Sequence, residues 1–332
     1  MTERDTTRRR FLQASAATVA TAALPATATA AESQWTVAET PSDTSDEPWQ
    51  TAKTPTGNTL YDVEYAADGA YAVGAGGVGL KRASEGWTKI FDGGVTGNGN
   101  SLYGADVTDD GERLWFVGSS GAVGEYDVTT GTLYNRSKPV GSTNNFNDVS
   151  VTGQAGEANV YVAGDSGKIY YSFENGASQT WDYVTPGSGA GLSAIDFHDA
   201  KSGHAVDTNQ KVFQTTDGVS YENIGIANAN VNFYGVDSDA TDDVWVSGGG
   251  GMVFHWDGAN WTPTDLGDAG LRDIEVTDDD AEALTVGGGG KVFDLSAGKW
   301  TQDATPTGQN LKAVARGDVN VAVGAGGTIV KN

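Results

Sequence analysis

The sequence contains no cysteine, which excludes disulfide bonds, thiolate catalysis and cysteine-ligated zinc. Basic residues are scarce too, because 20 Lys and Arg stand against 44 Asp and Glu, for a net charge of −24. A chain this acidic repels nucleic-acid phosphates and anionic lipid headgroups, so we expect no nucleic-acid partner. Dense carboxylates keep a protein hydrated at high salt, and we interpret the acidity as that of a halophilic protein.

Sustained helical patterns are missing after residue 31, and proline is rare, at eight residues. Glycine, by contrast, occurs 47 times and accompanies many Val, Thr, Tyr and Trp residues. This composition is typical of short strands joined by tight turns. The apolar fraction of 38% is enough for a folded core. The chain is therefore predicted to be an all-β protein.

The N-terminus forms a distinct segment. A mild apolar stretch at 14–24 is too short for a membrane span, and small residues at 28–30 suit a signal peptidase. The segment resembles a twin-arginine export signal, with signal residues Arg8, Arg9, Phe11 and Leu12. We expect a signal peptide at 1–30, an acidic flexible lead-in at 31–48, and a secreted or cell-surface protein whose mature chain has no transmembrane span.

A strand-like tetrad recurs seven times at intervals of 38 to 46 residues. Its copies begin at Leu60, Leu102, Phe146, Leu192, Phe233, Leu271 and Leu311. A turn of small residues follows almost every copy, although the fourth has Asp207 and Asn209 there, and most repeats then reach an aromatic residue. Four short strands at this period are typical of a propeller blade. Residues 49–332 are thus predicted to form a seven-bladed β-propeller rather than a linear β-solenoid, whose coils are usually shorter.

The last repeat lacks its fourth strand, and this indicates how the ring closes. The segment from Trp49 to Leu60 parallels the segment from Trp300 to Leu311, with Trp eleven residues before Leu in both. The N-terminal strand is therefore predicted to join the last blade and to remove two exposed sheet edges. Trp35 is a second candidate for the start of that strand.

The repeat, Leu-x-Asp-Val followed by Val-Gly-x-Gly-Gly, a turn and Trp, resembles that of the photosystem II stability/assembly factor-like propellers, which are related to the Asp-box repeats of neuraminidases. Degraded Asp boxes occur at 172–176 and 215–218. The resemblance implies a non-enzymatic propeller that binds membrane-protein intermediates through a basic patch. The arginines after the leader are few, with at most two in any repeat, at Arg82, Arg113, Arg136, Arg272 and Arg316. They form no cluster in the sequence, so we do not expect the photosystem role to transfer.

No catalytic or cofactor motif is complete. A sialidase-type site needs an arginine triad, and Ser–His–Asp hydrolysis needs a positioned histidine. His198, His204 and His255 are interpreted as surface residues instead. We expect no cofactor and no metal, although a metal at His198 and His204, or calcium at the Asp-rich turns 106–111 and 278–280, is the competing interpretation.

The second and third tetrad positions are the best candidates for a functional surface, because they belong to the innermost strands that line the channel. The second positions, which include Ser193, predict a partner-binding ring at the channel entrance formed by Tyr61, Tyr103, Asn147, Tyr234, Arg272 and Lys312. Three third positions are predicted channel acids, Asp62, Asp148 and Asp273. Packing between blades explains the same positions equally well, and both interpretations stay open.

The sequence therefore favours an exported, non-catalytic propeller, expected as a monomer, that binds a protein or a cell-surface polymer. The alternative is a glycan-acting hydrolase or lyase that uses the three channel acids. Asn135 and Asn260 lie in Asn-x-Ser/Thr sequons and are candidate glycosylation sites.

Overall fold

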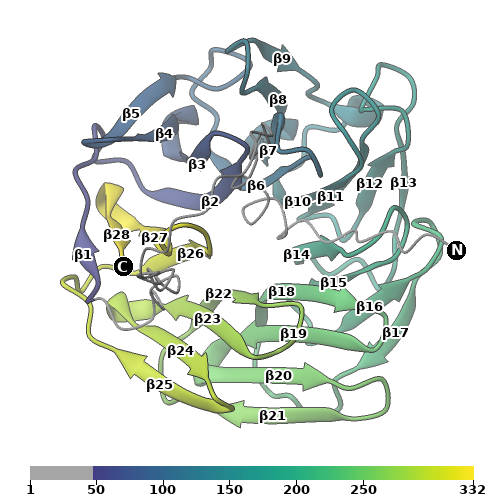
Figure 1. Ribbon diagram of the computed structural model, residues 1–332. Coiled ribbons are helices and arrows are strands. Elements are labelled where there is room, and N and C mark those ends of the chain that lie inside the picture. Colours follow the sequence, from purple (N-terminus) through teal and green to yellow (C-terminus); the bar gives the residue numbers. More distant parts are fainter. Residues whose placement is uncertain (1–47) are drawn as a thin grey trace, which may run out of the picture.

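The computed structural model describes residues 48–332, so the predicted signal peptide, most of the lead-in and Trp35 lie outside it. The described residues form seven four-stranded antiparallel sheets, which stand around a central axis as the blades of a propeller (Figure 1). The predicted all-β, seven-bladed architecture is confirmed. Among these residues, no helix has the length and apolar character that crossing a membrane requires.

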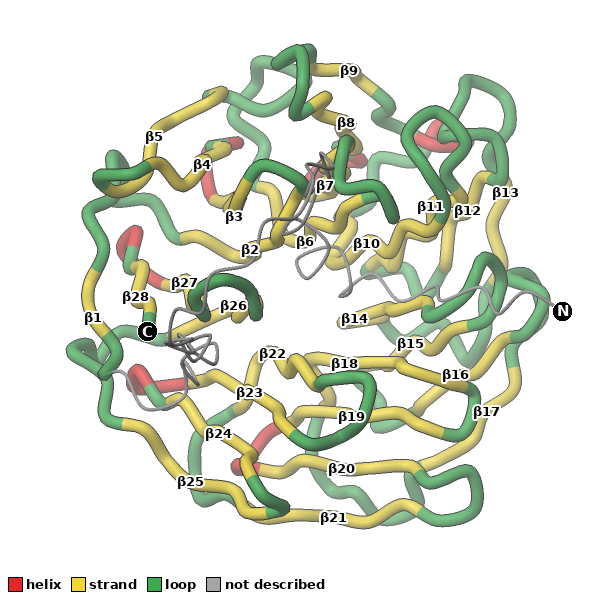
Figure 2. Tube along the Cα trace, in the orientation of Figure 1, coloured by secondary structure: helices red, strands yellow, loops and turns green. Residues whose placement is uncertain are grey.

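Each blade runs outward from an innermost strand beside the channel to an outermost strand at the rim (Figure 2). Blade 1 contains β2 (Leu60–Ala66), β3 (Gly69–Gly74), β4 (Gly79–Ala83) and β5 (Gly86–Phe91). Blade 2 contains β6 (Leu102–Val107), β7 (Arg113–Gly118), β8 (Val123–Asp127) and β9 (Leu133–Asn135). Blade 3 contains β10 (Phe146–Thr152), β11 (Asn159–Gly164), β12 (Ile169–Ser172) and β13 (Asp182–Val184). Blade 4 contains β14 (Leu192–Phe197), β15 (Gly203–Asp207), β16 (Val212–Thr215) and β17 (Glu222–Gly225).

The remaining three blades follow the same order. Blade 5 contains β18 (Phe233–Ala240), β19 (Asp243–Gly248), β20 (Met252–Trp256) and β21 (Trp261–Asp265). Blade 6 contains β22 (Leu271–Val276), β23 (Glu282–Gly287), β24 (Val292–Ser296) and β25 (Lys299–Asp303). Blade 7 contains β26 (Leu311–Ala315), β27 (Val321–Gly324), β28 (Ile329–Lys331) and, from the other end of the chain, β1 (Gln50–Thr51).

Short 3-10 turns link the second and third strands of five blades, namely η3 (Ala75–Gly77), η4 (Ser119–Gly121), η6 (Gly249–Gly251), η7 (Gly288–Gly290) and η8 (Ala325–Gly327). A further one, η5 (Pro139–Gly141), lies between blades 2 and 3. Glycine is required at Gly77, where φ is 71° and a Cβ atom would lie 2.3 Å from the backbone nitrogen of Gly94. In blade 4 the positive φ falls on Gln210, whereas the Asp207 carboxylate accepts backbone hydrogen bonds from within the turn.

The ring closes through the N-terminal strand, as predicted. β1 starts one residue after Trp49 and pairs antiparallel with β28, so the first and last described strands lie side by side (Figure 1). Trp49 is 5% exposed and packs between blades 6 and 7, against residues that include Leu284 and Val330. Its indole Nε1 donates a hydrogen bond of 2.9 Å to the Asp303 carboxylate of β25. The indole therefore fastens the closing strand to two blades at once.

Six aspartates of the innermost strands join neighbouring blades. One carboxylate oxygen of each accepts a hydrogen bond, 2.6–2.9 Å long, from a backbone amide in the innermost strand of the next blade. The amide donors and their acceptors are Ala105 and Asp62, Val151 and Asp106, Ile195 and Asp148, Ser238 and Asp196, Val276 and Asp237, and Val314 and Asp273. We call these six acceptors the bridging aspartates. In five of them the other oxygen accepts the amide of the following residue in the same strand.

A bridging aspartate stands at one of two places in the innermost strand, counted from the first tetrad residue. It is the third residue in blades 1, 3 and 6 and the fifth residue in blades 2, 4 and 5, where the third is Gly or Ala. Sterics couple the two places, because a Cβ atom on Gly104 would lie 2.6 Å from the Cα of Asp148 in the next blade. Blade 2 has no room for a side chain at its third position, and Asp106 supplies the carboxylate instead.

Blade 7 has alanine at both places, and other groups join it to blade 1. The Tyr65 hydroxyl donates a hydrogen bond of 2.6 Å to the carbonyl oxygen of Val319. Arg82 forms an ion pair of 2.7 Å with Asp318, which lies in the β26–β27 loop. The boundary between blades 7 and 1 is thus joined by side chains of blade 1 that reach across to blade 7.

We expect Trp49→Ala to lower the free energy of unfolding by about 3–5 kcal/mol, because it removes a buried indole from the closing strand. Trp49→Phe keeps most of the packing and removes only the hydrogen bond to Asp303, so it should lower the free energy of unfolding by clearly less than Trp49→Ala does. Denaturant titration at high salt measures both values. Equal stability of Trp49→Ala and the wild type would show that the ring does not depend on this contact.

Asp106→Ala should cost about 2–5 kcal/mol of unfolding free energy, because it leaves the buried amides of Val107 and Val151 without acceptors. Asp268→Ala is the matched control, since the Asp268 side chain is 93% exposed and pairs only with a surface lysine. We expect less than about 0.5 kcal/mol for that change. Similar losses from the two substitutions in chemical denaturation would contradict a bridging role for Asp106.

Candidate functional site

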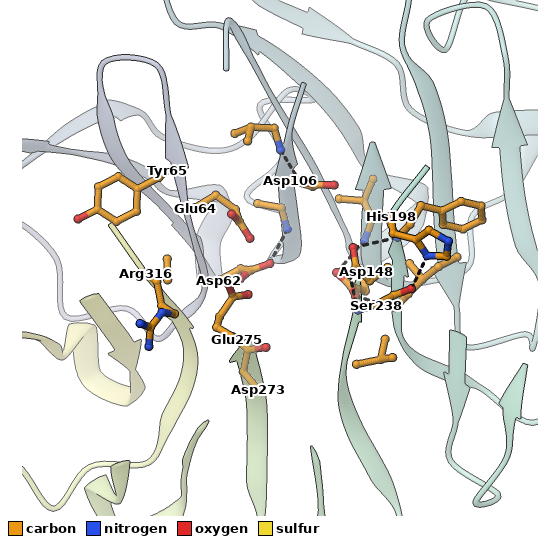
Figure 3. Close-up of a pocket in the computed structure, with 18 of the residues that line it drawn as sticks. Asp62, Glu64, Tyr65, Asp106, Asp148, His198, Ser238, Asp273, Glu275 and Arg316 are labelled. Carbon is orange, nitrogen blue, oxygen red and sulfur yellow. Dashed lines mark hydrogen bonds between the residues drawn. The ribbon is translucent and has the colours of Figure 1, made fainter. Parts of the chain in front are cut away.

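The channel contains a cavity of about 170 Å³ whose wall is dominated by carboxylates. Ten acidic residues line it, and Arg316 is the single Lys or Arg residue among the described lining residues. The ten acids are Asp62, Glu64, Asp106, Asp109, Asp148, Asp196, Asp239, Asp273, Glu275 and Asp278. Figure 3 shows Asp62, Asp148, Asp273 and their neighbours projecting from different blades toward one space. The cavity is therefore a site of strongly negative potential.

The predicted channel acids Asp62, Asp148 and Asp273 all line this cavity, and all three are bridging aspartates. Each accepts one amide from its own strand and one from the next blade. Burial raises the pKa of Asp148 to about 8 against the opposing effect of these hydrogen bonds. Because both oxygens of each carboxylate hold the backbone, the geometry does not favour their use in glycan cleavage.

The other three bridging aspartates were not among the site residues predicted from the sequence. Asp106, Asp196 and Asp237 lie two residues beyond the third tetrad position, outside the compared tetrads. A signal was present, because Asp occurs at the fifth position in three of the four blades that have Gly or Ala at the third. The Asp-rich turn at 106–111 is explained in the same way. The Asp106 carboxylate bonds to Val107 and Val151, and Asp110 accepts amides of its own turn and of blade 3.

Glu64 differs from the bridging aspartates, because it faces the cavity beside other acids. Its pKa lies well above the usual value, first through burial and then through the charges of Glu275 and Asp62. Figure 3 shows Glu64 and Glu275 reaching into the channel from blades 1 and 6. Ionising Glu64 in the folded protein therefore brings like charges close together in a buried site, which costs stability.

His198 and His204, considered as a metal pair from the sequence, share a serine in the structure. The Nδ1 atoms of the two rings lie 2.9 Å and 2.7 Å from the Ser238 hydroxyl oxygen. The interpretation of the histidines as surface residues is wrong for His204, which is fully buried, and burial and then the charge of His198 lower its pKa to about 3. A serine beside a histidine could suggest hydrolysis, but the acidic wall around Ser238 would oppose the negative charge of an oxyanion.

The predicted partner-binding ring lies at the start of the innermost strands, next to the cavity. Its residues stand at the second position of each strand, whereas the cavity lining begins at the third. Tyr61 and Tyr103 of adjacent blades meet edge to face, with ring centroids 5.1 Å apart. The guanidinium carbon of Arg272 lies 4.0 Å from the centroid of the Tyr234 ring. The structure thus brings these side chains together in pairs across blade boundaries.

The other ring members divide into packing and polar roles. The Asn147 amide donates to Asp165 and to the carbonyl of Leu192, each at 2.8 Å, so this side chain is held between blades. Arg272 and Lys312 lie in the innermost strands of adjacent blades, and burial and then the charge of Arg272 lower the pKa of Lys312. The entrance therefore combines three tyrosines with two cations, in a chain whose net charge is −24.

The remaining sequence candidates lie away from the channel or outside the structure. Asn135 ends the outer strand β9, and Asn260 lies in the β20–β21 turn, and both are exposed. Their glycosylation stays a prediction. The signal residues Arg8, Arg9, Phe11 and Leu12 lie outside the described residues.

Replacing Glu64 by Gln should raise the melting temperature near neutral pH. Since the folded-state pKa of Glu64 lies above its usual value of 4.5, the unfolded chain ionises first and stability is lost as the pH rises above 4.5. Below that pH the carboxyl is protonated in both states, and the advantage of Glu64→Gln should vanish. Thermal melts across this pH range, with the exposed Glu157→Gln as control, measure the effect. A pH-independent difference would refute this origin.

No family model matches the chain, and no curated protein sequence matches it. Among solved structures, the chain is similar to YCF48 bound to D1 peptide, with a TM-score of 0.68 and 15% identity over 86% of this chain and 96% of that one. The WD40 propeller domain of Doa1 is similar with a TM-score of 0.69 and 11% identity, over 85% of this chain and 94% of that one. Virginiamycin B lyase from Staphylococcus aureus is similar with a TM-score of 0.71 and 12% identity, over 85% of this chain and 98% of that one. These likenesses establish the propeller fold.

Proposed function

We propose that the protein is an exported propeller that binds a protein partner through the ring at its channel entrance. The observation that carries the proposal is the pairing of aromatic and cationic side chains there, Tyr61 with Tyr103 and Tyr234 with Arg272. Tyrosine and arginine supply much of the binding energy at protein interfaces, because they offer large contact areas together with polar groups. Lys312 adds a second cation beside Arg272.

The charges at the entrance favour an acidic peptide segment with an aromatic or apolar side chain. Arg272 is exposed, and its guanidinium is stacked on Tyr234, so it presents a fixed edge for a carboxylate. A tyrosine face beside it suits an apolar side chain of the same segment. The solved YCF48 propeller holds a D1 peptide, and this supports a peptide rather than a polysaccharide as the partner.

Export is the second part of the proposal. It is supported by the resemblance of the first thirty residues to a twin-arginine signal. A propeller whose ring closes through a strand that begins at Gln50 would suit a pathway that carries folded proteins, because closure needs both ends of the blade array.

A glycan-acting enzyme is not favoured on this scaffold. Asp62, Asp148 and Asp273, its candidate acids, accept backbone amides with both carboxylate oxygens. A general acid or nucleophile needs an oxygen within reach of the substrate. The lyase among the structural neighbours shares the fold at 12% identity, and fold alone does not bring its activity.

The triple variant Tyr61→Ala, Tyr103→Ala, Tyr234→Ala should lose roughly tenfold or more in affinity for peptides selected from a library by the wild-type protein. We expect that library to enrich peptides with acidic residues next to an aromatic or apolar one. Removing the two cations in Arg272→Ala, Lys312→Ala should weaken the same peptides and reduce the salt dependence of binding.

The control for this experiment removes aromatic side chains away from the ring. Tyr134 and Tyr183 lie on outer strands and are 41% and 45% exposed, so Tyr134→Ala, Tyr183→Ala should bind like the wild type. Circular dichroism at high salt checks that every variant is folded. Two results would overturn the proposal. One is an equal loss of peptide affinity in the ring variant and in the control variant Tyr134→Ala, Tyr183→Ala. The other is release of sugar from a glycan panel by the wild-type protein.

A further inference from the structure

Three side chains with metal-binding atoms meet at the seam between blades 5 and 6. Asp243 opens β19, His255 lies in the neighbouring strand β20, and Asp280 lies in the loop between β22 and β23 of blade 6. One ligand atom from each lies within 4.8 Å of the other two. The His255 Nε2 atom is 3.0 Å from an Asp243 oxygen and 3.9 Å from an Asp280 oxygen.

Trp245 fixes the orientation of two of these side chains. The imidazole of His255 stacks on the indole of Trp245, with ring centroids 4.1 Å apart and an angle of 10° between the planes. The same indole donates its Nε1 hydrogen to Asp280 Oδ1 at 2.8 Å, so the second oxygen of Asp280 is the one that approaches His255. Trp245 is itself 8% exposed and packs in the core between the two blades.

We propose that Asp243, His255 and Asp280 bind one divalent transition-metal ion, such as Zn²⁺, which bridges blades 5 and 6. A four-coordinate ion with bonds of about 2.1 Å holds its ligand atoms about 3.4 Å apart, and the two distances from His255 lie on either side of this value. Small side-chain movements would therefore complete the site. Hydrogen bonds that orient ligands from behind, as Trp245 orients Asp280, are typical of metal centres.

The ligand types select the metal. One imidazole nitrogen with two carboxylates suits Zn²⁺, Mn²⁺, Co²⁺ or Ni²⁺, whereas Ca²⁺ and Mg²⁺ prefer oxygen ligands alone. The two carboxylates balance a divalent charge, and among residues 48–332 they form ion pairs with His255 and with no Lys or Arg. The three side chains are 24–33% exposed, so an ion has access from solvent and a coordination position stays open to water or to a partner's side chain.

The simplest competing interpretation is a plain ion pair, in which a protonated His255 lies between two carboxylates. That arrangement leaves one uncompensated negative charge in a partly buried position, whereas a divalent ion with neutral His255 leaves none. The two interpretations differ in what they predict for added metal, because an ion pair binds nothing.

Calorimetric titration of the chelator-treated, full-length protein with Zn²⁺, in excess Mg²⁺ to occupy weak carboxylate sites, tests the proposal. We expect one saturable site per chain, a higher melting temperature with Zn²⁺, and visible absorption bands of four-coordinate Co²⁺. His255→Gln and Asp280→Asn should each weaken Zn²⁺ binding at least about tenfold and lose the Co²⁺ bands. Asp242→Asn removes the same charge next to Asp243 without removing a ligand, and it should bind as the wild type does.

Two results would overturn the proposal. One is a wild-type protein without a saturable Zn²⁺ site in the presence of Mg²⁺. The other is unchanged Zn²⁺ affinity in His255→Gln, which would place the ion elsewhere among the many carboxylates. Circular dichroism shows whether His255→Gln and Asp280→Asn are folded. If one of them does not fold, the Zn²⁺ affinity of the other tests the proposal. Since metal affinity is measured directly, the outcome does not depend on peptide binding at the entrance.

Discussion

The hydrogen bond between a carboxylate of one innermost strand and an amide of the next is the interaction on which the ring depends. An innermost strand pairs with its own blade along one edge only, so the amides of its other edge point toward the neighbouring strand without a ladder partner. A bridging aspartate such as Asp62 accepts two such amides at once, Val63 from its own strand and Ala105 from the next. Five of the six bridging aspartates accept two amides in this way, and all six join an innermost strand to the next from blade 1 to blade 7.

The fold was predictable because the signal for it repeats. Seven tetrads at a steady interval, all but the fourth followed by a small-residue turn, depend on local backbone chemistry that a single sequence displays. The closing strand was predictable for a similar reason, since the segment after Trp49 copies the one after Trp300. Only the exact edges of the strands needed the structure, as at β1, which starts after the tryptophan rather than on it.

The site was less predictable, because its groups are brought together across blades. Nothing near His255 in the sequence points to Asp280, which lies 25 residues further along and in another blade. The role of Asp148 depends on where the amide of Ile195 lies, 47 residues away. A repeat reveals which positions face the channel, but the partner of a given side chain depends on the rotation between blades. The choice between packing and binding at the second tetrad position needed the same information, and Asn147 proves to pack while Arg272 is exposed.

The channel also changes the interpretation of the protein's acidity. From composition alone the negative charge is explained by hydration at high salt, yet several of these carboxylates lie within the channel, where hydration is limited. Burial and like charges raise the pKa values of Asp62 and Glu64, so ionising these groups works against folding.

An aspartate is nevertheless the smallest side chain with two acceptor oxygens, and an asparagine in its place would offer one. The unpaired amides of the inner edges therefore explain the acids at the axis of blades 1–6, and hydration at high salt is not needed to explain them. The cations Arg272 and Lys312 lie at the start of the same strands, and the cavity carboxylates follow from the third position onward. An acidic segment approaching the ring would meet an attractive end and a repulsive interior, which favours binding at the rim of the channel over passage into it.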